Sequence, residues 1–238
     1  MGDLFVKFNF AWPWMGLAMA AVLSVLMIST DIFRSDENSH RWTDPVWLAW
    51  LVVPLYMFHQ FEEFALSYNV ATDSYNVVTE VCRLHGYKSY EPCPIPAVHF
   101  PFVNVLFAWI AAPLAAIMSK RNSLVGLSLY GFIFAEGVLH LTFGLLDHQP
   151  FLNHGGLITG SLLFIPISLW VIFIGVKANI MSCNAMICTI FAGVIGQICL
   201  FNAYSIFPDF GVTGMLIMDA IAVFIPLVLA ALVSRRII

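Results

Sequence analysis

Long apolar runs constrain the fold of this chain more than any other feature. About 20 consecutive apolar residues are enough for a helix to cross the hydrocarbon core of a membrane. Hydrophobic residues make up 61% of the 238 residues, well above the roughly 45–50% of soluble domains. The sequence therefore predicts an all-α, polytopic membrane helix bundle, a single transmembrane domain over residues 1–238. About seven transmembrane helices are expected, at Phe10–Ser29, Val46–Leu66, Pro101–Ser119, Ser123–Leu146, Gly156–Val176, Ala185–Tyr204 and Gly211–Val233.

Ionisable side chains interrupt two of these apolar runs. The second run contains His59, Glu62 and Glu63, and the fourth contains Glu136 and His140. A charge at the centre of a bilayer costs at least about 2.5 kcal/mol, so such residues usually have partners. Each group has helical spacing that puts its members on one face. We expect the two helices to pack together and to present two imidazoles and three carboxylates to one point.

Imidazoles and carboxylates at this spacing indicate a metal site, because they suit zinc, iron and manganese. We predict that the site binds one or two divalent ions, with zinc as the first choice of metal and iron as the second. In a one-zinc site, His59, one of the adjacent glutamates and His140 would bind the ion and leave a position open for water. The remaining glutamate would take a proton, so Glu62 and Glu63 are the candidate catalytic residues. A two-metal site would use five or six ligands from a set made up of His59, Glu62, Glu63, Glu136, His140 and His154. The alternative is that these groups are polar contacts between helices.

The distribution of Lys and Arg predicts an orientation. One side of the seven-span topology carries Arg34, Arg41, Lys120, Arg121, Lys177, Arg235 and Arg236, whereas the other carries Lys7, Arg83 and Lys88. Because cytoplasmic loops are enriched in these residues, the N-terminus is expected outside and the C-terminus in the cytoplasm. All candidate ligands then fall in the outer half of the bilayer.

The predicted outer loop, at about residues 67–100, holds Cys82 and Cys93, which can form a disulfide on an oxidising side. Three further polar residues are expected around the metal site, namely Asn104, His148 and Asn153. His99 is predicted to lie at the surface. Asp219, inside the seventh run, is expected to pair with Asn202 or Gln197. Four tryptophans are expected to anchor the chain at the membrane interface, namely Trp12, Trp14, Trp42 and Trp47.

Three elements in order resemble the HXXEE family of multi-span membrane proteins. The first is His59-x-x-Glu62-Glu63, and the second is the Glu136 and His140 pair, similar to a polar-x-x-x-His element. The third, NHGGLITGSLLFIP at 153–166, is similar to the family's Pro-Gly-Leu-x-Thr and Leu-Leu-x-x-Pro stretch, with Gly155 in place of the usual proline. The resemblance covers about residues 45–170. It implies a membrane protein with suspected metal-dependent enzymatic activity, and no particular reaction.

The sequence favours a metal-dependent membrane enzyme, a hydrolase that acts on a lipid or an amphipathic small molecule. A site below the headgroups and lined by Phe suits a substrate that partitions from the bilayer. One alternative is a di-iron oxidoreductase, and another is an ion- or proton-coupled transporter. A proton relay would need polar residues that continue inward from Glu136, where the two runs are almost wholly apolar. The chain has no basic run, so a nucleic-acid partner is not expected.

Overall fold

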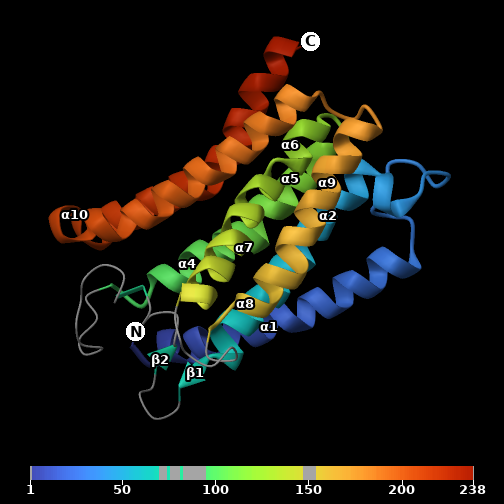
Figure 1. The fold of residues 1–238 in the computed structure, drawn as a ribbon. Helices are drawn as coiled ribbons and strands as arrows, with labels where there is room; N and C mark the ends of the chain where they lie inside the picture. The colour runs from blue at the N-terminus through green and yellow to red at the C-terminus, as the bar shows by residue number, and fades with distance from the viewer. Residues whose placement is uncertain (1, 70–73, 76–80, 83–94, 147–153, 238) are drawn as a thin grey trace.

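The computed structural model describes residues 2–69, 74–75, 81–82, 95–146 and 154–237, and these form a helical bundle (Figure 1). The all-α prediction is confirmed. The first half contains α1 (Gly2–Ser29), the 3₁₀-helix η1 (Arg41–Thr43), α2 (Pro45–Gln60), the π-helix η2 (Phe61–Leu66) and two paired strands, β1 (Tyr68–Asn69) and β2 (Ser74–Tyr75). The second half contains α4 (His99–Val105), the π-helix η3 (Leu106–Ala111), α5 (Ala112–Ser119), α6 (Ser123–Leu127), α7 (Leu129–Leu146), α8 (Leu157–Thr159), the π-helix η5 (Gly160–Phe164), α9 (Ile165–Lys177) and α10 (Cys183–Ile237).

Five helical stretches of the described chain are long and apolar enough to cross a membrane, as expected for an integral membrane protein. They are Lys7–Ser29, His99–Ser119, Ser123–Leu146, Leu157–Lys177 and Cys183–Ser234. The predicted count of seven is not confirmed. The second predicted run corresponds to α2 and η2, which carry the buried Glu62 and Glu63, and the last two runs both fall within α10.

Helix α10 is broken at Gly211, whose φ of 64° and ψ of −169° are not helical. Only glycine adopts such a conformation at little cost. A Cβ on Gly196 would lie 2.9 Å from the carbonyl oxygen of Ala222, so the arms before and after the break pack against each other. The part of α10 that follows Gly211 ends beside the start of α6, where Asn122 Nδ2 donates a hydrogen bond to Ser234 Oγ at 2.7 Å.

The start of α2 is fixed by Asp44, which is buried and caps the helix in front of Pro45. Its Oδ1 accepts from the backbone N–H groups of Val46 and Trp47, at 2.8 and 3.0 Å. Its Oδ2 accepts from Ser35 and Ser39 in the loop that follows α1. Burial raises the pKa of Asp44, but these hydrogen bonds outweigh it, and the pKa lies below its ordinary value.

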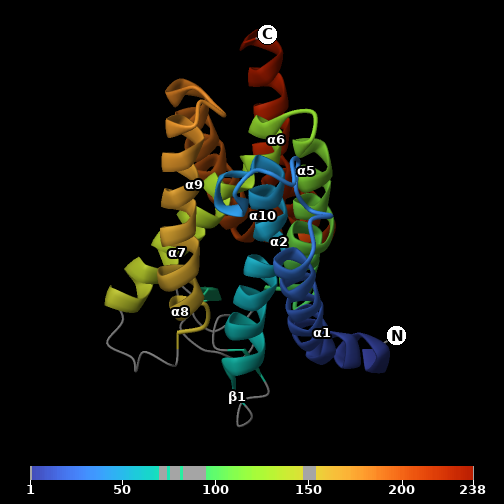
Figure 2. The ribbon, with the colours of Figure 1, turned by 90° about the vertical axis from the view of Figure 1, so that its right-hand side faces the viewer.

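The helices around the site approach closely because small residues line their crossings. A Cβ on Gly193 of α10 would lie 2.0 Å from the carbonyl carbon of Gly131 in α7. Small residues allow this kind of contact between membrane helices. Tyr130, next to Gly131, donates a hydrogen bond to the Leu48 carbonyl at 2.7 Å and joins α7 to α2. In the view of Figure 2, α1 and α9 lie on opposite sides of α2.

Two of the four tryptophans predicted as interface anchors are instead part of the packed interior. Trp12 is fully buried, and the buried Trp47 donates from Nε1 to the Met27 carbonyl at 3.0 Å. Trp14 and Trp42 are exposed. The outward faces of the helices carry large apolar side chains such as Ile28, Leu162 and Phe191, as a lipid-facing surface requires.

Candidate metal centre

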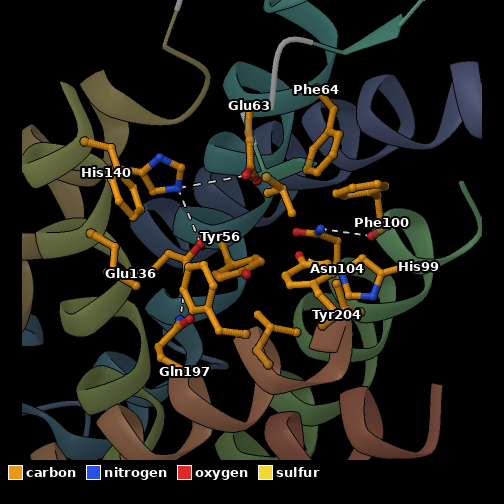
Figure 3. Close-up of a pocket in the computed structure, with 16 residues that line it drawn as sticks. Tyr56, Glu63, Phe64, His99, Phe100, Asn104, Glu136, His140, Gln197 and Tyr204 are labelled. Atoms are coloured by element: carbon orange, nitrogen blue, oxygen red, sulfur yellow. Dashed lines mark hydrogen bonds and ion pairs between the residues drawn. The ribbon is translucent and has the colours of Figure 1, made fainter. Parts of the chain in front are cut away.

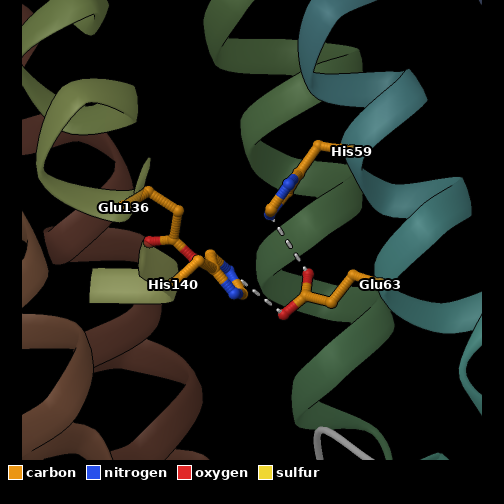
Figure 4. Close-up of side chains that lie close together, drawn as sticks. All are labelled: His59, Glu63, Glu136 and His140. Atoms are coloured by element: carbon orange, nitrogen blue, oxygen red, sulfur yellow. Dashed lines mark ion pairs between the residues drawn. The ribbon is translucent and has the colours of Figure 1, made fainter. Parts of the chain in front are cut away.

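Four of the predicted ligands come together in one cluster, formed by His59, Glu63, Glu136 and His140 (Figure 4). Each residue offers one ligand atom, and these atoms all lie within 4.8 Å of one another. His59 comes from the end of α2, Glu63 from η2, and Glu136 and His140 from α7. The second and fourth apolar runs therefore meet at their ionisable residues, and the cluster can hold a metal ion.

The spacing within the cluster suits a shared ion better than direct hydrogen bonds. Glu63 lies 3.6 Å from His59 Nε2 and 3.9 Å from His140 Nε2, and Glu136 lies 3.4 Å from His140 Nε2. Hydrogen bonds between such atoms are normally about 2.7–3.2 Å long. Ligand atoms about 2.1 Å from a tetrahedral zinc lie roughly 3.4 Å apart. The observed distances are close to that value.

His59 is oriented as a metal ligand requires. Its Nδ1 forms a 2.8 Å hydrogen bond with the Thr159 hydroxyl, and its Nε2 points into the cluster. That Nε2 is buried and has no hydrogen-bond partner among the described residues. When Nδ1 carries the proton, Nε2 presents its lone pair to an ion. The ring packs against Phe164, with 4.5 Å between the ring centroids.

Glu136 is oriented from α10. Gln197 Nε2 donates a hydrogen bond to Glu136 Oε2, while Oε1 faces His140. Gln197 lies one turn beyond the glycine crossing of α7 and α10, so that crossing brings the amide to the carboxylate. The prediction that Gln197 or Asn202 pairs with Asp219 is wrong. Asn202 is exposed and donates to the Ile198 carbonyl.

Glu62 lies outside the four-residue cluster, although the sequence suggests it as a ligand and a catalytic residue. Its two carboxylate oxygens accept from the backbone N–H groups of Ile158 and Thr159, both at 2.7 Å. Adjacent residues on a helix point in different directions, so Glu62 and Glu63 of η2 face different neighbours. Glu62 thus holds the start of α8, which carries the Thr159 hydroxyl to His59.

Two glycines before α8 allow this segment to approach the cluster. Gly156 has a φ of 84°, and a Cβ there would lie 2.6 Å from Cε1 of both His59 and His140. A Cβ on Gly155 would lie 2.6 Å from the Glu63 carbonyl oxygen. Gly155, which stands where the resembled stretch usually has proline, thus lies directly against the helix that carries Glu63.

The other predicted site residues have different outcomes. His154 is buried but is not a member of the cluster. Asn104 lines a cavity that three members of the cluster also line. His148, Asn153 and Cys93 lie outside the described residues, and Cys82 is buried. Cys82 takes part in a disulfide, and because Cys93 lies outside the described residues, the Cys82–Cys93 pairing stays a prediction. The prediction that His99 lies at the surface is wrong, because its ring is fully buried and also lines the cavity.

The cavity has a volume of about 80 Å³ (Figure 3). Glu63, Glu136 and His140 line one side, and Asn104, His99 and Tyr204 line the other. Its remaining walls are mainly apolar and include Phe64, Phe100, Val103, Leu139, Phe143, Leu200 and Phe201. The cluster is thus open to a small space inside the bundle.

Comparison with known proteins agrees with the motif. The family described as "Protein of unknown function with HXXEE motif" matches residues 50–171, just over half of the chain. No curated protein and no solved structure matches the chain. The matched residues include all four members of the cluster as well as Glu62, Gly156 and Thr159. The resemblance drawn from the sequence is confirmed, and this protein belongs to the HXXEE family.

Proposed function

We propose that this protein is an integral membrane metalloenzyme that hydrolyses a lipid or an amphipathic small molecule, with zinc ahead of iron at the cluster. The observation that carries the proposal is the convergence of two imidazoles and two carboxylates at one buried point. Two of the four are oriented by hydrogen bonds from outside the cluster, His59 by Thr159 and Glu136 by Gln197. Such outer contacts are typical of metal sites and tune the ligands.

The residues divide into ligands and a base. His59, His140 and Glu63 would hold the ion, since Glu63 is the carboxylate that lies within 4 Å of both imidazoles. A divalent ion held there supplies Lewis acidity, which activates water and polarises a carbonyl. Glu136 would take the proton from the attacking water at Oε1, because Gln197 occupies Oε2. The same carboxyl would then return this proton to the leaving group.

The apolar walls of the cavity support a lipid-like substrate. Phe64, Phe100 and Phe143 border the space next to Glu63 and Glu136. Such walls exclude bulk water and strengthen the electrostatic interactions between the ion site and a bound carbonyl. The cavity is too small for a whole lipid, so only the reacting polar group would enter it.

Metal analysis of the purified chain tests this proposal. The protein in detergent should carry about one divalent ion per chain, and His59→Ala and His140→Ala should each lose most of it. His40→Ala is the matched control, because His40 is exposed and lies outside the cluster. Equal metal content in all four proteins, or full activity of the metal-free protein, would refute the proposal. Bound iron together with a requirement for oxygen would assign the oxidoreductase instead.

A further inference from the structure

A second set of buried polar side chains faces the cavity, across from the four-residue His/Glu cluster (Figure 3). His99, at the start of α4, joins the two arms of α10. Its Nδ1 lies 2.8 Å from Asp219 Oδ2, and its Nε2 lies 2.8 Å from the Tyr204 hydroxyl. All three side chains are buried. The reversal at Gly211 is what brings Tyr204 and Asp219 to the same histidine.

The chemistry of the three groups sets the direction of the hydrogen bonds. When Asp219 is a carboxylate it can only accept, and His99 then carries its proton on Nδ1. The Nε2 of the neutral ring then accepts, and the Tyr204 hydroxyl donates to it. In that arrangement the phenolic oxygen can accept a hydrogen bond from a group in the cavity. His99 and Asp219 are positioning residues, because they act by fixing the Tyr204 hydroxyl.

Asn104 presents a second acceptor to the same space. Its Nδ2 donates to the Phe100 carbonyl at 2.9 Å, which turns Oδ1 the other way (Figure 3). That Oδ1 is buried and has no hydrogen-bond partner within the described part of the chain. Asn104 as a whole is 5% exposed, and its backbone carbonyl accepts a hydrogen bond from Gln60 Nε2 at 2.6 Å. A buried acceptor without a donor is costly, so a ligand donor at this point would be favourable.

We propose that Asn104 and Tyr204 form a subsite that accepts a hydrogen bond from an N–H or O–H group of the substrate. The substrate class is a neutral lipid-like molecule with an amide or hydroxyl next to the carbonyl that is cleaved. No Lys or Arg is among the described residues that line the cavity, whereas Glu63 and Glu136 are. A phosphate headgroup would therefore meet two carboxylates and no cationic side chain, so only the bound ion itself would offset its charge. Partly buried apolar residues of α7 and α10, such as Leu139 and Phe201, can cover the first part of the acyl chain.

This inference rests on the proposed function, and a matched pair of amides tests it separately. N-methyldodecanamide has one N–H donor, and N,N-dimethyldodecanamide has none. We would measure the affinity of both for the full chain in detergent, together with its metal content. One neutral hydrogen bond should favour the donor by about 2- to 10-fold. Asn104→Leu and Tyr204→Phe should each lower this ratio, and Asn202→Leu, at an exposed asparagine, should leave it unchanged.

His99→Phe should lower the same ratio at unchanged metal content, which a purely structural role would not predict. An equal affinity of the wild-type protein for the two amides would overturn the inference, and so would tighter binding of dodecyl phosphate. Bound metal without a donor preference would leave the metalloenzyme proposal intact and reject the subsite. If the chain binds no metal but shows a donor preference that depends on Asn104 and Tyr204, the subsite stands and the metalloenzyme proposal is rejected.

Discussion

The hydroxyl of Thr159 lies 2.8 Å from Nδ1 of His59, although the two residues are 100 positions apart in the sequence. The contact exists because the Glu62 carboxylate binds the backbone N–H groups of Ile158 and Thr159. Within the His59-x-x-Glu62-Glu63 motif, the imidazole and Glu63 enter the cluster, and Glu62 holds the segment that orients the imidazole. The three motif residues thus have distinct structural positions.

Thr159→Val should weaken metal binding about 10- to 100-fold, as the loss of outer-shell partners typically does. Valine has nearly the same shape but offers no acceptor for the His59 N–H group. The measurement is a competition titration of the purified protein against a metal chelator. Thr142→Val is the control, because Thr142 is an exposed threonine of α7. Unchanged affinity of Thr159→Val would show that the hydrogen bond has no part in metal binding.

Gly156→Ala should lower both the metal content and the thermal stability. An added Cβ would meet both imidazoles at 2.6 Å, and the φ of 84° is strained for any residue with a Cβ. The conformation alone should cost about 1–2 kcal/mol. Gly16→Ala is the control, because its Cβ would meet Gln60 Oε1 at an ordinary 3.5 Å. Thermal unfolding and metal analysis of both variants check this, and equal behaviour would contradict the described turn.

Glu63→Gln and Glu136→Gln should separate a ligand from a base. Glu63 lies near both imidazoles, so its substitution should remove most of the metal. Glu136→Gln should retain the metal but lose at least about 100-fold in turnover, in keeping with the usual contribution of a general base. Metal content and turnover are measured on the same preparations. If Glu136→Gln keeps full activity, or if Glu63→Gln keeps its metal, the assigned roles are wrong.

Asp44 should make stability depend on pH at the start of α2. Its pKa is lower in the folded chain than its ordinary value of 3.8. Its stabilising contribution is therefore present above about pH 4 and is lost as the pH falls through the lower, folded-state pKa. Asp44→Ala should cost about 0.5–2 kcal/mol at pH 7, as the loss of a helix cap does. Thermal unfolding of both proteins from pH 7 to pH 3 should show the difference shrinking, and a constant difference would refute this account.

The predicted orientation can be tested with single cysteines at opposite ends of the bundle. Glu37→Cys, in the loop after α1, should react with an impermeant thiol reagent only after the cells are permeabilised. Asp209→Cys, just before the break in α10, should react in intact cells. Labelling of the parent chain provides the background for its own cysteines. The opposite pattern would place the N-terminus in the cytoplasm.

The sequence by itself determined the helical class, the family and the two groups of ionisable residues that meet at the cluster. These inferences succeed because helical periodicity is local. Residues three or four positions apart share a face in any helix, and a buried charge must find a partner. The spacing of His59 and Glu63, and of Glu136 and His140, is therefore enough to predict all four members of the cluster.

Tertiary structure alone decided how neighbouring groups divide their roles and which distant residues complete the site. Glu62 and Glu63 are equivalent by type and differ only because η2 turns one toward α8 and the other toward α7. Gln197 reaches Glu136 because Gly131 and Gly193 let two helices touch. His99 meets Asp219 because α10 reverses at Gly211. Crossings and reversals depend on packing between segments far apart in the chain, and helical periodicity carries no information about them.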